Sequence, residues 1–447
     1  MRKFAPAIIC LVVIFCITPA FAKSNLTVTK AFRSLLKSGN IVTRSATLDA
    51  QLDRVKTFYA TRNNKPIWVR DSGPKGKAKA LVAELRTSAV HGLSPEFYHF
   101  TEINSLMSSK VPDELARLEL LLSGALVEFG GDLMNGRVGP AINGSMNAVE
   151  PFDLKADVYI QEAEATGNLR RFMGGLLQSD KRYVRLITKM VEFIKLQKSG
   201  IWPKIQAEGK AIPVGRSDPR MRDVRMLMAL GGDLPINKMN DGIKHDKFTV
   251  AAVKKFQQRH GLQQNGIVDK QTLLQMAIAP SERVKQIKIN LERRRWQVRS
   301  VADDHLHINM VNGSMRLMRN GKVAGRYSLL NHAKFKNLPT FLGDLILVEQ
   351  TIKNNIRPEI SISATNSAGL NPMEIIDVFK LDDADAFIMA LTQSNNHKTG
   401  DTIKLSKPLP IFMTYVTAWA TRDGRINFYP DIFKRDALLF EQLTSAN

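Results

Sequence analysis

The segment "EISISATNSAGLNPMEIIDVFKL" (Glu359–Leu381) has the residue types of a catalytic loop. Small polar residues and a Ser-x-Gly turn precede a run whose apolar spacing is helical. Covalent acyl transfer needs a nucleophile beside a general base. The segment contains no cysteine, no histidine and no obvious general base. Its residues therefore pose the question of whether this loop is an active site or a former one.

The two cysteines, Cys10 and Cys16, lie in an N-terminal stretch that has the features of a secretory signal peptide. A basic start and a short apolar run precede an A-x-A motif that ends at Ala22. The run is shorter than the roughly 20 residues of a membrane span. We therefore predict that residues 1–22 are cleaved and that the mature chain is periplasmic, without an integral membrane span. Such a chain has no thiol nucleophile, no thiolate metal site and no disulfide.

The histidines and glycines do not form a metal or phosphate motif. The 8 histidines show no His-x-x-x-His or carboxylate pairing at ligand spacing. The glycine pairs in "GGDL" and "MGGLL" lack the lysine and the flanking strand of a phosphate-binding loop. We predict neither a metal site nor a cofactor.

The chain is strongly basic, with a formal net charge of +22. In a cytosolic protein such a charge favours nucleic acid as the partner. Because the chain is predicted to be exported, we predict no nucleic-acid partner and favour anionic envelope polymers, including the peptide-bearing murein. General solubility is the alternative, because the basic residues are spread along the chain and the densest cluster, "ERRRW" (Glu292–Trp296), is short.

The apolar pattern of the first part of the chain is helical. In "ELARLELLLSGALVEFGGDLMNGRV" the residues Leu115, Leu118, Leu122 and Leu126 recur at spacings of three and four. Neighbouring segments repeat this spacing, and a Pro- and Gly-rich stretch follows. We predict a helical domain over residues 23–205.

A small module of three short helices is predicted over residues 215–280. Asp218 is the predicted N-cap of the first helix. The second, "FTVAAVKKFQQRHG", places Val253 and Phe256 on one face, and Asp269 is expected to cap the third.

After residue 300 the apolar period changes to two, which predicts strands. Asn312-Gly313, Asn320-Gly321 and Asp423-Gly424 lie between alternating runs and predict hairpin turns. One inserted helix is expected from Pro372 to Leu381. Residues 281–447 are thus predicted to be a mainly antiparallel β domain, and the whole chain to be α+β and multidomain.

Several segments together resemble the large periplasmic L,D-transpeptidases. "FYATRNNKPIWV", "GLSPEFY" and "WPKIQAEGKAIPVGRSDPRMRDVRMLMALGGDL" resemble the scaffold region of that family. "TVAAVKKFQQRHGLQQNGIVDKQTLLQM" is similar to the peptidoglycan-binding repeat, a three-helix module that holds murein. "APSERVKQIKINLERRRW" resembles the joint before the YkuD-type catalytic domain, and "LPIFMTYVTAWATRDGRINFYPDIFKRDALL" resembles its closing strands. The matches cover nearly all of the mature chain in the order of the family.

The resemblance implies a reaction whose machinery this sequence lacks. In the family, a cysteine thiolate activated by an upstream histidine attacks a murein tetrapeptide stem and passes the acyl group to a second stem. Laid over the family's His and Ser-x-Gly-Cys-x-Arg signature, Ser363 occupies the histidine position, Ser367 matches, and Leu370 stands in place of the cysteine. Loss of a nucleophile or its base costs on the order of a million-fold in turnover. The resemblance therefore predicts no catalytic residue and a degenerate catalytic domain.

The favoured hypothesis is an exported peptidoglycan-binding pseudoenzyme that acts in cell-wall organisation. Binding is expected mainly in the 215–280 module, on exposed side chains rather than on Val253 or Phe256. The polar candidates are Arg259, His260 and Asn265. Each of these is also an ordinary surface residue type.

Two other hypotheses remain open. The first is an active murein acyl transferase in which Ser363 or Ser367 replaces the cysteine and His332 is the base. The second is an interaction protein that binds another envelope protein, with murein binding incidental. Release of D-alanine from murein tetrapeptides distinguishes the first from a pseudoenzyme.

Overall fold

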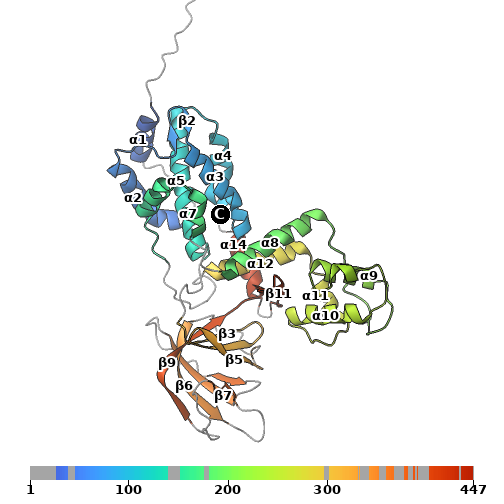
Figure 1. Ribbon diagram of the computed structural model, residues 1–447. Coiled ribbons are helices and arrows are strands. Elements are labelled where there is room, and N and C mark those ends of the chain that lie inside the picture. The colour runs from blue at the N-terminus through green and yellow to red at the C-terminus, as the bar shows by residue number, and fades with distance from the viewer. Residues whose placement is uncertain are drawn as a thin grey trace, which may run out of the picture.

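The protein has three parts: a helical region, a small helical module at its side, and a sheet at the far end (Figure 1). The computed structural model describes residues 27–38, 46–138, 152–175, 181–295, 302–330, 332, 342–351, 359–366, 377–380, 386–387, 390, 402–431 and 434–445. The predicted signal peptide, residues 1–22, lies outside these ranges. Within the part of the chain that the structure describes, no helix combines the length and apolar character needed to cross a membrane.

The long helix α5 (Pro112–Asn135) packs against α1 (Val28–Ser38), α2 (Ala46–Thr61), α3 (Gly76–Thr87), α4 (Phe100–Leu106) and α6 (Ala156–Ala165). Helix α7 (Leu169–Gly175) packs on α3, and α8 (Lys181–Ser199) is the last helix of this region. Leu115, Leu118, Leu122 and Leu126 of α5 are all 0% exposed, which confirms the predicted apolar face.

A buried carboxylate connects α5 to the segment that leads into strand β1 (Val69–Arg70), which pairs with β2 (Gly73–Pro74). Glu119 Oε1 accepts hydrogen bonds from the Tyr59 hydroxyl (2.6 Å) and the Ile67 backbone N–H (2.6 Å). Glu119 Oε2 accepts from the backbone N–H groups of Trp68 (2.8 Å) and Val69 (3.1 Å). Burial raises the pKa of Glu119 to about 7, although these donors favour its charged form.

Helix α8 packs on elements from the end of the chain. Its apolar side chains share one core with α12 (Pro280–Arg295) and with the hairpin of β10 (Ala418–Ala420) and β11 (Ile426–Phe428). The core comprises Tyr183, Leu186, Met190, Phe193, Val284, Ile287, Leu291, Ala418, Ala420, Ile426 and Phe428. Helix α14 (Arg435–Ser445) packs on the other side of α12. This core joins α8, which precedes the module in the sequence, to α12 and the β10–β11 hairpin, which follow it. The predicted domain limits 23–205, 215–280 and 281–447 stay a prediction.

The module consists of α9 (Met221–Leu230), the 3₁₀ turn η4 (Ile236–Lys238), α10 (Lys247–Arg259) and α11 (Lys270–Met276). The predicted cap of the third helix is confirmed, because Asp269 accepts from the Thr272 N–H at 2.8 Å. The predicted cap of the first helix is wrong. Helix α9 begins at Met221, and the Asp218 carboxylate is held instead by the backbone and guanidinium of Arg220.

The described residues form a mainly antiparallel seven-stranded sheet of order β5-β4-β3-β9-β6-β7-β8, in which only β3 and β9 pair in parallel. The strands are β3 (His305–Asn309), β4 (Ser314–Arg319), β5 (Lys322–Ser328), β6 (Leu342–Thr351), β7 (Glu359–Asn366), β8 (Asp377–Lys380) and β9 (Thr402–Thr414). Asn320 (φ 48°) and Gly321 (φ 68°) both have positive φ, as the predicted turn requires. The α+β prediction is confirmed.

One predicted element has the wrong type. Residues 377–380, expected at the end of a helix from Pro372 to Leu381, form β8 and pair with Glu359–Ile362 of β7. Val378 and Phe379 favour strands, and pairing satisfies the backbone edge of β7. A short apolar run fits both periods, so the pattern alone did not separate them. Residues 372–376 lie outside the described ranges.

Candidate functional site

The positions assigned to the lost catalytic machinery are described only in part. Ser363 lies on β7, where its backbone is in register with Leu347 of β6. Ser367 and Leu370 lie outside the described residues. His332, the candidate base of the serine hypothesis, has Nδ1 at 3.0 Å from the carbonyl oxygen of Leu329. The assignment of these positions therefore stays a prediction.

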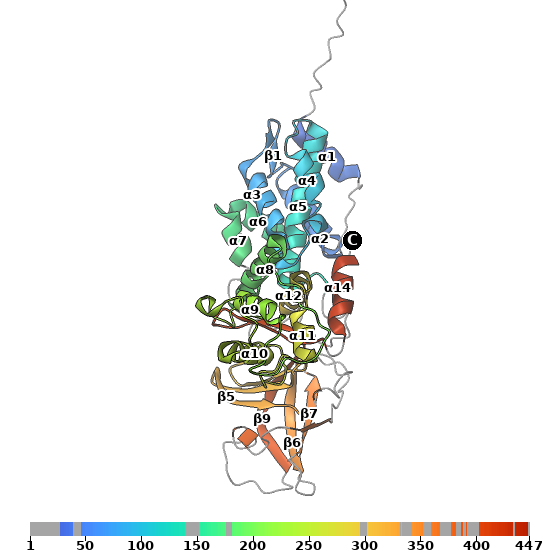
Figure 2. The ribbon, with the colours of Figure 1, turned by 90° about the vertical axis from the view of Figure 1, so that its right-hand side faces the viewer.

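The module contains one wall of a cleft of about 540 Å³, a volume that includes solvent at its mouth. The opposite walls come from α8, the chain around Trp202, and β11. Figure 2 shows the module in front of the junction between the helical region and the sheet. The cleft therefore lies between the module, helix α8 and the β10–β11 hairpin.

Arg259, one of the predicted site residues, lines this cleft but is only 8% exposed. Its Nε donates to both carboxylate oxygens of Asp233 at 2.9 Å, and its Nη2 lies 2.5 Å from Oδ2. Its Nη1 donates to the Ile426 carbonyl of β11 at 2.9 Å. The guanidinium is thus engaged in an ion pair within the module and in a hydrogen bond that fixes the module to β11.

His260 also lines the cleft and is 2% exposed. Its ring stacks on Phe256 with centroids 3.8 Å apart, and its Nδ1 lies 2.8 Å from the Phe256 carbonyl oxygen. Burial, and then the charges of Arg259 and Arg283, hold the pKa of His260 well below its usual range. A neutral imidazole that donates from Nδ1 to this carbonyl leaves Nε2 as an acceptor.

Asn265 lies outside the cleft lining and is half-buried. Its Oδ1 accepts from Gln257 Nε2 (3.0 Å) and from the Ile267 N–H (2.8 Å), so it shapes the loop after α10. The three candidates were expected among exposed side chains, and Arg259 and His260 are buried instead. The structure brings these two together and leaves Asn265 apart. Their contribution to ligand binding stays a prediction.

Aromatic residues that were not predicted from the sequence as site residues also line the cleft. Trp202 follows α8 and lies 6.0 Å from Phe193, which in turn packs edge-on against Phe428 at 5.5 Å. The Nε1–H of Trp202 is buried and has no hydrogen-bond partner among the described residues. The sequence did contain one indication of this role, a tryptophan within a linker that is otherwise poor in apolar residues. A tryptophan in such a linker is expected to pack against an apolar surface of the folded chain.

The rim of the cleft is polar and the wall is aromatic. Lys189 pairs with Glu192 on α8 at 2.6 Å, and Arg425 pairs with Asp423 beside β11. Apolar and aromatic walls with a few placed polar groups are typical of small-ligand sites. Among the residues that the structure describes, no group of three or more His, Cys, Asp or Glu is placed to hold a metal ion. The arrangement suits binding of a molecule with both apolar faces and hydroxyl or amide groups.

Comparisons with known families match two parts of the chain. Residues 53–190 are similar to the family described as Scaffold domain, and residues 224–276 to the family described as Putative peptidoglycan binding domain. No curated protein matches the chain. The two matched domains, in this order, are consistent with an L,D-transpeptidase-like architecture.

Proposed function

We propose that this protein is an exported, non-catalytic relative of the L,D-transpeptidases that binds peptidoglycan. The observation that carries the proposal is the match of residues 224–276, which form α9 to α11 and their connections, to a peptidoglycan-binding family. The family description is the reason for choosing murein among the anionic polymers of the envelope.

The cleft beside the module is the proposed contact site. Sugar rings have apolar faces that pack on aromatic side chains, and hydroxyls that accept hydrogen bonds. Trp202 offers both an aromatic face and a buried N–H without a partner among the described residues. The neutral His260 ring offers an acceptor at Nε2, and Lys189 and Arg425 stand at the rim for peptide carboxylates.

The absence of catalysis is proposed on chemical grounds. Residues 23–447 contain no cysteine. If the first 22 residues are removed, a thioester cannot form on the remaining chain. The proposed role is therefore binding and organisation of the cell wall rather than acyl transfer.

Binding is tested by sedimentation of the purified chain with insoluble murein at physiological salt. Trp202→Ala and Arg425→Gln are each expected to lower retention about tenfold, which corresponds to ~1.4 kcal/mol. Phe248→Ala is the matched control, because Phe248 is a 42% exposed aromatic of α10 that does not line the cleft. Unchanged retention in both cleft variants, with normal unfolding curves, contradicts the proposed site.

Catalysis is tested by incubation with murein tetrapeptides. No release of D-alanine is expected. Release that disappears in Ser363→Ala or Ser367→Ala would instead establish the serine-dependent acyl transferase. If the chain does not sediment with murein but binds another envelope protein, the interaction hypothesis is favoured.

A further inference from the structure

The module cleft contains a buried cation, Arg283 of α12, to which the proposed murein contact gives no role. Arg283 lines the cleft and is only 4% exposed. Its Nη1 donates to Gln286 Oε1 at 3.0 Å. Its Nη2 donates to the backbone carbonyl oxygen of Gln275 at 3.0 Å and to Gln275 Oε1 at 3.1 Å. These acceptors are neutral amide oxygens, so they satisfy N–H groups without cancelling the positive charge.

Buried arginines elsewhere in the described chain are paired with carboxylates. Five arginines are buried, and four of them form an ion pair at 2.8 Å or less. The four pairs are Arg225–Asp246, Arg259–Asp233, Arg293–Asp436 and Arg295–Glu292. Such pairing is the rule because an isolated buried charge costs several kcal/mol. Arg283 is the fifth, and no carboxylate of the described residues forms an ion pair with it.

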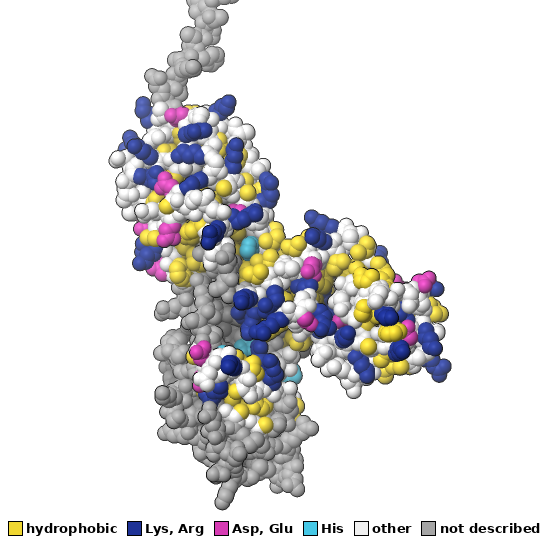
Figure 3. Space-filling model, in the orientation of Figure 1, with side chains coloured by type: hydrophobic (Ala, Val, Ile, Leu, Met, Phe, Trp, Pro, Cys, Tyr) yellow, Lys and Arg dark blue, Asp and Glu magenta, His cyan; other side chains and the backbone are white. Residues whose placement is uncertain are grey.

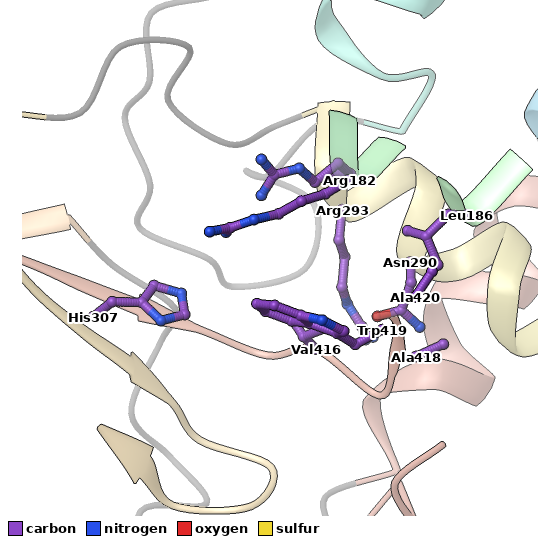
Figure 4. Close-up of a pocket in the computed structure, with 10 residues that line it drawn as sticks. Arg182, Leu186, Asn290, Arg293, His307, Val416, Ala418, Trp419 and Ala420 are labelled. Atoms are coloured by element: carbon purple, nitrogen blue, oxygen red, sulfur yellow. The ribbon is translucent and has the colours of Figure 1, made fainter. Parts of the chain in front are cut away.

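A second cleft shows how another arginine of α12 is neutralised. This α8–α12–β10 cleft lies where those elements meet β3, and its volume, open solvent at the mouth included, is about 420 Å³. Arg293 is among the residues that line it (Figure 4). None of its described lining residues is acidic, but Asp436 of α14 pairs with Arg293 from outside the lining at 2.5 Å. The equivalent places around Arg283 are taken by the amides of Gln275 and Gln286.

The other charged residues that line the module cleft each have an opposite charge beside them. The pairs are Lys189–Glu192, Arg259–Asp233 and Arg425–Asp423. Among the described residues, the charge of Arg283 is thus the one in excess. Burial, and then repulsion from Arg259, lowers the pKa of Arg283 to about 9, as expected for a cation without an anion nearby. Arg283 therefore stays charged at neutral pH.

The guanidinium of Arg283 is fixed in place and keeps one donor for a ligand. Its Cζ lies 4.4 Å from the centroid of the Phe428 ring, so it stacks on the aromatic wall of the cleft. Its Nε makes no hydrogen bond to the described residues, whereas Nη1 and Nη2 both do. A carboxylate oxygen beside Nε would use this donor and supply the opposite charge, and charge-assisted hydrogen bonds of this kind are the strong ones.

The surface around the module does not by itself select a ligand. Figure 3 shows more Lys and Arg than Asp and Glu side chains on the face where the module joins the rest of the chain. Such a surface attracts anions of every kind, and salt screens the attraction. A buried cation is screened much less, and it separates a charged group from a neutral group of the same shape.

We propose that Arg283 is the specificity-determining residue of the module cleft and binds a carboxylate of the murein peptide stem. This inference rests on the proposed function, because murein as the ligand makes the anion a peptide carboxylate. Lys189 and Arg425 at the rim already pair with acids, so Arg283 is the cation that gains most from the ligand's charge. The aromatic wall around Trp202 then holds the apolar part of the ligand.

The experiment is calorimetric titration of the full chain with a murein tetrapeptide and with the same peptide whose carboxylates are converted to amides. In the unaltered chain, amidation is expected to weaken binding about tenfold or more. In Arg283→Gln the free peptide is expected to bind about tenfold more weakly, and amidation to change its affinity by less than about twofold. Arg283→Met is the second variant, because its unbranched side chain fills similar space. Unfolding curves show that each variant is folded, and the ratio of the two affinities within one folded variant does not report on stability.

Lys285→Gln is the control, because it removes the same charge from the exposed side of α12 without lining the cleft. It is expected to keep the full preference for the free peptide. A preference that survives in Arg283→Gln, or that is lost equally in Lys285→Gln, overturns the proposal. So does a chain that sediments with murein but does not bind the tetrapeptide or does not distinguish its amide. In those cases the proposed function stands, whereas failure of the unaltered chain to sediment with murein contradicts the proposed function itself.

Discussion

At the scale of single residues, Glu119 makes the stability of the helical region depend on pH. Its buried carboxyl has a pKa of about 7 against an ordinary value of 4.5. Between these values the folded chain binds a proton that the unfolded chain has released, so the free energy of unfolding falls as the pH rises. The expected loss from about pH 4.5 to about pH 7 is on the order of 3 kcal/mol.

Glu119→Gln removes this titration and is expected to remove its contribution, a fall in stability with rising pH, from the pH dependence. The measurement is urea unfolding followed by fluorescence at about pH 5 and about pH 8. Glu114→Gln is the control, because Glu114 is exposed on the same helix. A pH slope that is the same in Glu119→Gln as in the unaltered chain, or that changes equally in Glu114→Gln, contradicts the assignment.

In the module, the burial of some single residues was predictable from the sequence and that of others was not. Val253 and Phe256 are buried, as their spacing predicts, and Asp269 caps its helix. Arg259 is a polar residue on the sequence pattern, yet it pairs with Asp233 and with the backbone of β11, far along the chain. The spacing of residues within one helix does not indicate partners that lie far away in the sequence. The burial of the charged Arg259 side chain was therefore not predictable from that spacing.

At the scale of elements, α12 is a buried helix that is rich in polar residues. Gln286 Nε2 donates to the carbonyl oxygens of Thr417 (3.0 Å) and Tyr429 (2.9 Å), and Glu292 accepts from the Val138 N–H (2.9 Å). Its polar side chains thereby satisfy backbone groups on two sides. This explains why a helix with a weak apolar stripe lies in the interior.

Asn290 of α12 makes two buried hydrogen bonds to Thr417. Its Nδ2 donates to Thr417 Oγ1 (2.7 Å), and its Oδ1 accepts from the Thr417 N–H (3.0 Å). Asn290→Leu leaves a buried donor without its partner, at about 1 to 3 kcal/mol. Thermal unfolding is expected to show this loss, whereas Lys285→Leu on the exposed side of α12 is expected to change the midpoint little. Equal midpoints in the two variants would show that the hydrogen bonds contribute nothing.

The elements differ in how far the sequence specifies them. The long apolar face of α5 and the paired positive φ values at Asn320 and Gly321 are local features, and both are predicted. Strand β8 owes its type to pairing with β7 and was predicted as a helix. The shared core of α8, α12 and the β10–β11 hairpin depends on contacts between distant segments, and periodicity did not disclose it.

At the scale of the whole molecule, both clefts lie at junctions between parts. The module cleft has an aromatic wall and a paired rim, whereas the α8–α12–β10 cleft is lined by arginines without an acidic residue among its described lining. Neither cleft is complete within one of the three parts. Their residues were therefore hard to select from the sequence, although each part was recognisable.

The aromatic wall of the module cleft predicts that murein retention responds weakly to salt. The Debye length falls from ~10 Å at about 0.1 M to ~3 Å at about 1 M, so charge-dominated binding weakens across this range while aromatic contacts do not. Retention by charge alone is expected to fall by about tenfold or more, and retention in the aromatic cleft by much less. Sedimentation with murein over one salt series provides the curve, with Lys198→Gln as the control for net charge. If murein retention falls about tenfold or more over the series, the +22 charge of the chain, rather than the aromatic cleft, holds the polymer.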